Sequence, residues 1–340
     1  MANKQYKSII RLFEYCAIPT GEELNLGRAR KQLQAEFRAA RDGFIEADGF
    51  SYTSQEVFEE IEHEDFPKRL QWHQKIWQHK TVLQLLEKNT APVAALGEAL
   101  KPFLHNREFD QFFSPYFVGP FAYISRTLLA ANKLNDMGVL LAYEDFLQPA
   151  EREEAFRPLR LYLDENIRIL RNVNKENYRI MRPKIMHWIE DEWSVMLNNL
   201  PHELYDLKLD ITIKLLNLTV FIQRTHRKEC RKVSYQLVAL SDLPENIMDR
   251  INKNHHAYVR FENRESSGAG CWGFILIFII IKLFTLRTCD SPTKKQYKFP
   301  TLPQSTIDSI LRKIHDSANR STPDTFIIAP EVVVPERWNQ

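Results

Sequence analysis

The sequence predicts a mainly α-helical protein: a multi-helix bundle or helical-repeat-like domain at the N-terminus, followed by one C-terminal hydrophobic helix that spans the membrane. Three observations support this fold class. Apolar residues recur at spacings of three and four along most of the chain, as they do on one face of a helix. Only 10 of 340 residues are glycine, which disfavours turn-rich β architectures and glycine-lined nucleotide folds. Charged residues make up 26% and apolar residues 44%, ordinary proportions for a globular chain.

The helical domain is expected to cover residues 1–253. Residues 24–44 place six apolar side chains on one face. Residues 43–53 combine aromatic and β-branched residues with an Asp-Gly turn signal, which predicts a short hairpin or an extended link. Ser54 is expected to cap a short helix that follows. Further helices are expected over 68–88, 92–104, 107–114, 119–146, 152–175, 177–200, 205–232 and 244–254.

Prolines divide this helical series. Five lie near expected junctions, where the missing N–H is tolerated: Pro92, Pro115, Pro120, Pro149 and Pro201. Three others lie inside helical patterns and are expected to kink, split or shorten their helices: Pro102, Pro158 and Pro183.

One internal similarity raises the alternative of a helical-repeat solenoid. Residues 161–170 match residues 207–216 at an offset of 46, within the range of HEAT and armadillo repeats. Two copies do not establish an array, because such architectures need about three repeats. A general helical bundle and a solenoid both remain open.

Residues 269–286 form the apolar run that sets the predicted location of the protein. Eleven of the eighteen positions are Phe, Ile or Leu, and these contribute about −3 to −7 kcal/mol to insertion. Lys282 would cost roughly 2.5–3.5 kcal/mol at a helix centre, but it lies four residues from the end and can snorkel. Trp272 suits the headgroup level at the other end. We therefore expect a transmembrane helix.

Two alternatives stay open for this run. As a helix it would be about 27 Å long, slightly short of a ~30 Å hydrocarbon core, which permits a re-entrant segment. It could also be a buried strand or core helix. The flanks carry four Lys or Arg each within twenty residues, so the positive-inside rule sets no topology. Residues 254–268 are expected to be a linker, and 287–340 a basic link, a short helix and an extended tail.

A basic cluster precedes the run and predicts contact with anionic lipid. Residues 220–300 carry 14 Lys and Arg against 7 Asp and Glu. On one continuous helix, spacings of three and four would place four of the cations on a single face: Arg224, Arg227, Lys228 and Arg231. Such a face can hold phosphate. The alternative is a solvated helix C-terminus, where cations suit the macrodipole. Nucleic acid is disfavoured, because no aromatic residues are interleaved.

Two acidic segments contain histidine beside carboxylates, a combination that can bind a metal. His187 and Asp191, at i and i+4 on an expected helix, are weak candidates for two metal ligands, with a solvated acidic face as the alternative. The segment Glu59–Asp65, with His63 among its carboxylates, is expected to be a solvated helix end. The four cysteines show no CxxC spacing, so neither a disulfide framework nor a zinc site is predicted.

These patterns predict a membrane-tethered helical interaction or scaffold protein. Its N-terminal domain is expected in the cytoplasm, because residues 1–16 lack a secretory h-region. Anionic membrane lipid and a protein are the expected partners, and no cofactor is predicted. One alternative is a membrane-acting effector that oligomerises and perturbs the bilayer, favoured by Lys282 within the apolar run. The other is an enzyme without a recognisable motif, the less favoured class because no nucleotide-binding or nucleophile motif occurs.

Overall fold

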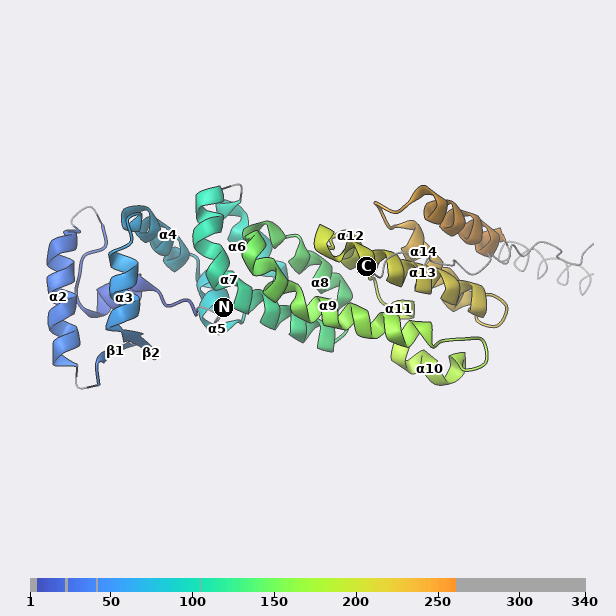
Figure 1. Ribbon diagram of the computed structural model, residues 1–340, viewed down its shortest axis with the longest axis horizontal. Helices are drawn as coiled ribbons and strands as arrows, with labels where there is room; N and C mark the ends of the chain where they lie inside the picture. The colour runs from blue at the N-terminus through green and yellow to red at the C-terminus, as the bar shows by residue number, and fades with distance from the viewer. Residues whose placement is uncertain (1–4, 22–23, 41, 105, 261–340) are drawn as a thin grey trace, which may run out of the picture. The chain divides into compact units, whose positions relative to one another are not determined.

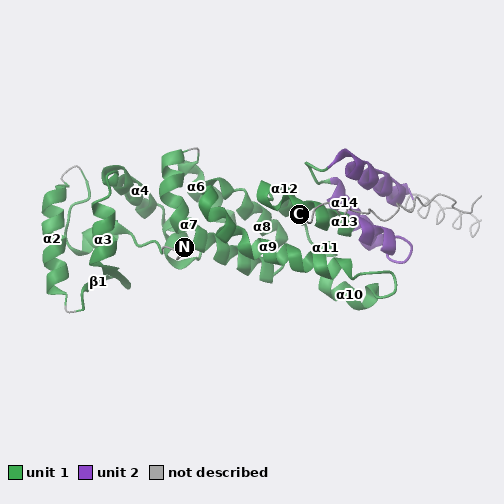
Figure 2. Ribbon diagram, viewed as in Figure 1, with its two compact units in different colours: residues 1–215, 239–243 green, residues 216–238, 244–340 purple. Residues whose placement is uncertain are grey.

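The computed structural model describes residues 5–21, 24–40, 42–104 and 106–260, and these residues are mainly α-helical (Figure 1). The predicted fold class is therefore confirmed for this part of the chain. The chain divides into two compact units (Figure 2). Unit 1 contains residues 1–215 and 239–243, and unit 2 contains residues 216–238 and 244–340.

Unit 1 begins with a small hydrophobic core built by four helices and a hairpin. Their apolar side chains, from Ile9 to Leu70, form one buried cluster. The elements are α1 (Ile9–Tyr15), α2 (Leu26–Ala39), β1 (Phe44–Ala47), β2 (Phe50–Thr53), α3 (Ser54–Ile61) and α4 (Phe66–Gln78).

The hairpin predicted from the Asp-Gly signal is present. β1 and β2 pair antiparallel, with Phe44 opposite Thr53. Asp48 and Gly49 have φ values of 48° and 79°, the two positive angles of a type I′ turn. The expected cap at Ser54 is displaced by one residue. Thr53 caps α3 in a capping box with Glu56, because its hydroxyl accepts from the Glu56 N–H at 3.2 Å and the Glu56 carboxylate accepts from the Thr53 N–H at 3.2 Å.

A second group of helices in unit 1 packs around the long helix α7. α7 contacts α4, α5, α8 and α9. The elements are α5 (Lys80–Lys88), α6 (Val93–Leu100), η1 (Lys101–Phe103), α7 (Arg107–Ala130), α8 (Leu134–Leu141), η2 (Glu144–Phe146), α9 (Pro149–Arg171), α10 (Tyr178–Ile185), α11 (His187–Glu190), α12 (Ser194–Asn198) and η3 (His202–Leu204).

Helix α7 runs through both prolines that were expected to mark helix ends. It continues from Arg107 to Ala130 with Pro115 and Pro120 inside it. Phenylalanines at every fourth position are fully buried along it, and successive rings contact each other at centroid distances of 4.9, 5.0 and 5.5 Å: Phe109, Phe113, Phe117 and Phe121. We attribute the continuity to this buried stripe, since tertiary packing offsets the hydrogen bond that each proline removes.

Helices α8 and α12 approach each other closely at Gly138. A Cβ atom added there would lie 2.7 Å from the backbone nitrogen of Met196 and 2.8 Å from the carbonyl carbon of Val195. Only glycine permits this backbone contact.

The expected helix over 205–232 is two helices. α13 (Tyr205–Ile222) ends where the N–H groups of Thr225 and His226 turn back onto the Ile222 carbonyl, and α14 (Arg227–Val238) begins immediately afterwards. Residues 245–260 form a further helix, so the first seven residues of the expected linker are helical.

The two segments of the internal similarity lie on α9 and α13, in different environments. Glu165 is exposed on α9, whereas Ile211, its match on α13, is fully buried. The burial of the two segments agrees at Ile167 and Ile213 and at Leu170 and Leu216, so the similarity is shared only in part.

The apolar run at 269–286, with Trp272 and Lys282, lies outside the described residues. Among the residues that the structure does describe, no helix is both long and apolar enough to cross a membrane.

Candidate functional site

The predicted basic face is reorganised by the break between α13 and α14. Arg224 lies in the connection, so it does not share a helix face with Arg227, Lys228 and Arg231. These three residues stand in the first turns of α14 rather than at a helix C-terminus. For these three residues a favourable interaction with a helix C-terminus does not apply, because the N-terminal end of a helix repels cations and attracts anions. Arg224 follows the C-terminal end of α13.

Helix α14 nevertheless carries an outward basic face. Its inner face buries Cys230, Val233, Ser234 and Leu237. Spacings of three, four and seven place four residues on the opposite side: Lys228, Arg231, Lys232 and Tyr235. We call this set the α14 basic face.

An aromatic ring lies among the cations of this face. The Tyr235 side chain is 49% exposed, and the Arg231 guanidinium lies 5.6 Å from its ring centroid. Lys228 and Lys232 are exposed. The face can therefore offer two ammonium groups, a stacked guanidinium and an amphipathic ring to a phosphate-bearing surface.

The inner side of α14 is held by polar contacts within unit 2. The Ser234 hydroxyl lies 2.8 Å from Nδ1 of His255, a nucleophile–base spacing, but Ser234 is only 2% exposed and out of reach of a substrate. The Cys230 thiol donates to the Thr219 carbonyl at 3.4 Å, and burial raises its pKa to about 12. Both side chains hold α14 in place within unit 2, and neither is placed to act as a nucleophile.

The two metal candidates do not share a helix face. α11 ends at Glu190, and Asp191 has extended backbone angles. Nε2 of His187 lies 2.8 Å from Oδ1 of Asn166, which also accepts from the Trp188 indole N–H at 2.8 Å. Burial lowers the pKa of His187 to about 4, which keeps its ring neutral. No group of three potential metal-ligating side chains occurs among the residues described.

The acidic segment expected to be solvated contains a buried carboxylate, Glu60, which is 9% exposed. Arg69 binds its two oxygens from Nε and Nη2 at 2.6 and 2.7 Å. Nε2 of His73 lies 3.2 Å from Oε1, and Nδ1 of His73 lies 2.8 Å from the Tyr6 hydroxyl. Nε2 of His73, when protonated, donates to Glu60, and a neutral ring would accept from Tyr6 at Nδ1.

The hydrogen bonds at Glu60 outweigh its burial. Burial alone would raise the pKa of this carboxyl, but the bonds from His73 and Arg69 hold the pKa of Glu60 well below its usual range. Burial raises the pKa of Tyr116, and the charge of the nearby Glu60 raises it further. The network was missed because its members are separated by up to 110 residues in sequence.

A second buried pair joins α1 to α5. Arg11 donates from Nη1 and Nη2 to the two oxygens of Glu87, at 2.5 and 2.9 Å. The Arg11 guanidinium also lies 4.3 Å from the Phe50 ring centroid and 5.2 Å from that of Trp77. Both charges of the pair are thereby matched inside unit 1.

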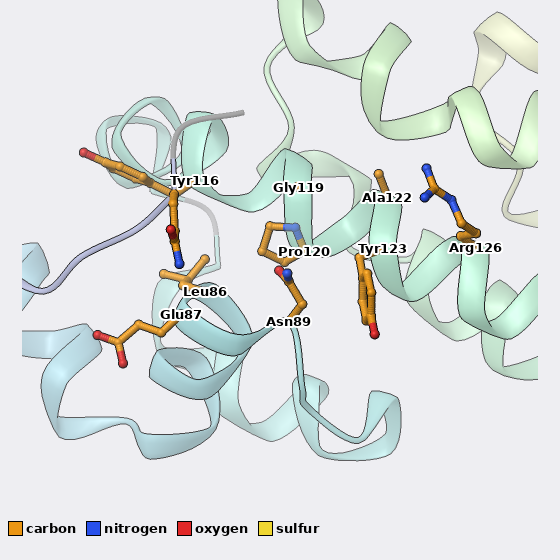
Figure 3. A pocket seen from close by; sticks show the side chains of 10 residues that line it. Leu86, Glu87, Asn89, Tyr116, Gly119, Pro120, Ala122, Tyr123 and Arg126 are labelled. Carbon is orange, nitrogen blue, oxygen red and sulfur yellow. The ribbon is translucent and has the colours of Figure 1, made fainter. Parts of the chain in front are cut away.

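A pocket of about 450 Å³ lies between the end of α5 and the middle of α7 (Figure 3). We call it the α5–α7 pocket. It is lined by Gln5, Leu86, Glu87, Asn89, Tyr116, Gly119, Pro120, Ala122, Tyr123 and Arg126. Asn89 ends α5 in the left-handed conformation, and its side chain points toward Pro120 on α7 (Figure 3).

The chain matches no protein-family model, no curated protein and no solved structure.

Proposed function

We propose that the protein is a membrane-tethered helical interaction protein. Its apolar run at 269–286 attaches it to the bilayer, and the α14 basic face binds anionic headgroups. A protein partner binds the helical domain, which stays on the cytoplasmic side. The observation that supports lipid contact best is the α14 basic face, with two exposed lysines and the half-exposed Tyr235 on one side of a helix.

The chemistry of the face favours a membrane surface over a single phosphate ligand. Lysine ammonium groups are hydrated point charges that bind headgroups without fixed geometry, and each contributes about 1 kcal/mol near an anionic leaflet. A tyrosine ring suits the interface, where one end is apolar and the other wet.

Membrane attachment is tested by fractionating cells that express the full chain and by protease protection of its C-terminal tail. We expect the chain to remain with membranes after alkaline extraction. Replacing Ile277 and Ile280 by Asp within the run should release it. Recovery of the unaltered chain in the soluble fraction would refute attachment through 269–286.

The α14 basic face is tested in the variant with Asp at positions 277 and 280, because that variant is expected not to insert into the bilayer and its binding to vesicles then depends on surface contacts. Lys228→Gln with Lys232→Gln should weaken flotation with phosphatidylserine-containing vesicles by roughly 30-fold, from about 1 kcal/mol for each lysine. The matched control is Lys31→Gln with Lys88→Gln, two exposed lysines of unit 1 with the same charge change. Equal binding by both double variants would show that the face does not contact lipid.

The protein-partner part of the proposal draws on exposed apolar side chains. Ile180 on α10 is 79% exposed and Leu161 on α9 is 60% exposed, and these two helices contact each other. Cross-linking of intact membranes followed by mass spectrometry should identify a protein that is lost in Ile180→Asp but kept in Arg179→Gln. An unchanged set of cross-linked proteins would refute a role for this helix in partner binding.

A further inference from the structure

A histidine lies at the edge of the α14 basic face. It is His255, on the helix over residues 245–260, and its ring centroid lies 4.6 Å from that of Tyr235 with the two planes at 72°. The Arg231 guanidinium lies 5.6 Å from the same tyrosine ring. His255 is half-buried, and both helices belong to unit 2. A proton taken up by this ring therefore adds a positive charge directly beside the face.

The surroundings of His255 keep its ring neutral at pH 7. Burial lowers the pKa of His255, and repulsion from His256 and Arg231 lowers it further, below the ordinary value of about 6.5. The titratable or charged groups that face it among the described residues are Arg231 and Tyr235 on α14 and His256 on its own helix. α13 contacts this helix through Thr219, which carries no charge. No carboxylate in the described part of the chain pairs with His255, so mild acidification charges the ring.

The Ser234 hydroxyl can hold His255 in both protonation states. Its oxygen lies 2.8 Å from Nδ1 of His255 and 3.2 Å from the Arg231 carbonyl oxygen. When Nδ1 carries no proton, the hydroxyl donates to it. When Nδ1 is protonated, Nδ1 donates to the hydroxyl oxygen and the hydroxyl donates to the carbonyl instead. Because only the hydroxyl proton moves, the two helices can stay packed as His255 becomes charged.

An anionic headgroup relieves the repulsion between His255 and Arg231. A lipid phosphate beside both cations attracts each of them, so it favours the protonated ring over the neutral one. By linkage, protonation of His255 then favours lipid binding by the same factor. One further cation near an anionic leaflet is expected to raise the affinity about fivefold, equivalent to about 1 kcal/mol.

We propose that His255 makes membrane binding by the α14 basic face dependent on pH, so that the protein binds anionic lipid more tightly in mildly acidic surroundings. The inference rests on the proposed lipid contact of this face and states how that contact is regulated. The group that changes its charge is one histidine ring, and the ligand is the phosphate of a bilayer headgroup.

The test uses the full chain with Ile277→Asp and Ile280→Asp, which we call the parent. Its flotation with vesicles of phosphatidylcholine and phosphatidylglycerol is measured at about pH 7.5 and about pH 5, on either side of the ordinary histidine range. Phosphatidylglycerol is used because its phosphate stays ionised at both values. The gain in affinity on acidification should be about fivefold smaller in His255→Gln than in the parent. The control His63→Gln, at an exposed histidine of unit 1, should keep the full gain.

A variant with a permanent charge gives the opposite response. His255→Arg should bind about fivefold more tightly than the parent at pH 7.5, because it carries the charge before any acidification. A misfolded protein would not produce this gain, so the two substitutions together separate a change of charge from a loss of structure. Far-UV spectra of both variants report whether the helices remain.

Two outcomes would overturn the proposal. One is an equal gain on acidification in His255→Gln and His63→Gln, and the other is no tighter binding of His255→Arg than of the parent at pH 7.5. If Lys228→Gln with Lys232→Gln still weakens flotation at pH 7.5 in either case, the lipid contact stands and only its pH dependence is refuted. If those lysine changes have no effect at pH 7.5, the lipid contact and its regulation are both refuted.

Discussion

Replacing Glu60 by Gln is expected to destabilise unit 1 more than any exposed charge change on the same helix. The substitution keeps the size of the side chain but removes the charge that Arg69 binds with two nitrogens and His73 with one. The Glu60 and Arg69 side chains are 11% and 18% exposed, so the guanidinium left behind is poorly solvated.

The magnitude follows from this burial. Breaking a buried ion pair by removing one partner costs about 3–5 kcal/mol, and the residual exposure of Arg69 places this case near the lower limit. A loss of about 3 kcal/mol corresponds to a shift of roughly 100-fold in the folding equilibrium. It should also lower the melting temperature by about 6–12 °C for a unit of this size.

The pH dependence gives a second signature of the same residue. A carboxyl whose pKa is lower in the folded than in the unfolded state stabilises the fold above its unfolded pKa, about 4.3 for Glu. That stability is lost as the pH falls further toward the folded pKa of Glu60, which lies well below the usual range. The Glu60→Gln variant should therefore be less stable than the unaltered protein at neutral pH. Below about pH 4.3 its free energy of unfolding should fall less with decreasing pH than that of the unaltered protein.

The assay is urea unfolding of the full-length protein, followed by tryptophan fluorescence at pH 7 and at pH 3.5. Glu59→Gln is the control, because Glu59 is the exposed neighbour on α3 and bonds only to Gln55 among the described residues. If Glu60→Gln and Glu59→Gln unfold at the same urea concentration, or if both keep the same acid sensitivity, the buried pair does not stabilise unit 1.

Three further changes test other parts of the fold. Gly138→Ala should lower the free energy of unfolding by about 1–3 kcal/mol, because the new Cβ meets the backbone of α12 at 2.7 Å. In the control Gly27→Ala on α2, the new Cβ meets only a side-chain oxygen, at 3.4 Å. Equal melting temperatures of the two variants would refute the close contact. His187 has a pKa lowered to about 4, so its protonation favours the unfolded state and stability should fall as the pH drops from about 6.5 toward 4; an NMR titration with a midpoint near 6.5 would contradict this. Thr53→Ala should cost about 1 kcal/mol by removing the cap of α3, while Thr53→Ser should restore most of it in the same urea assay.

Local signals predicted the elements whose causes are local. The hairpin follows from two adjacent residues, Asp48 and Gly49, that accept positive φ angles, and the structure has it in the expected place. The helical fold class follows from apolar periodicity and is confirmed over the described residues. The cap at Thr53 was missed by one position because a threonine and a serine stand side by side and either can cap a helix.

Helix boundaries were harder, because tertiary contacts decide them. Pro115 and Pro120 read as helix ends from sequence alone, yet α7 runs through both. Conversely, no proline or glycine between Ile222 and Arg227 predicts a helix end, yet α13 ends at Ile222 and α14 begins at Arg227. That break removes Arg224 from the predicted face, and the buried side of α14 leaves Lys232 and Tyr235 beside Lys228 and Arg231.

The same long-range dependence explains the acidic segment around Glu60. Six of the seven residues from 59 to 65 are ionisable, which resembles a solvated helix end, and most of the segment is exposed. Glu60 alone turns inward, because Arg69 and His73 on α4 supply three hydrogen-bond donors to its carboxylate. Charge patterning along one helix cannot reveal such a partner, since the donors stand on the next helix. Glu60 and Glu87 thus resemble surface residues in their local sequence, and only the arginine that binds each of them identifies it as buried.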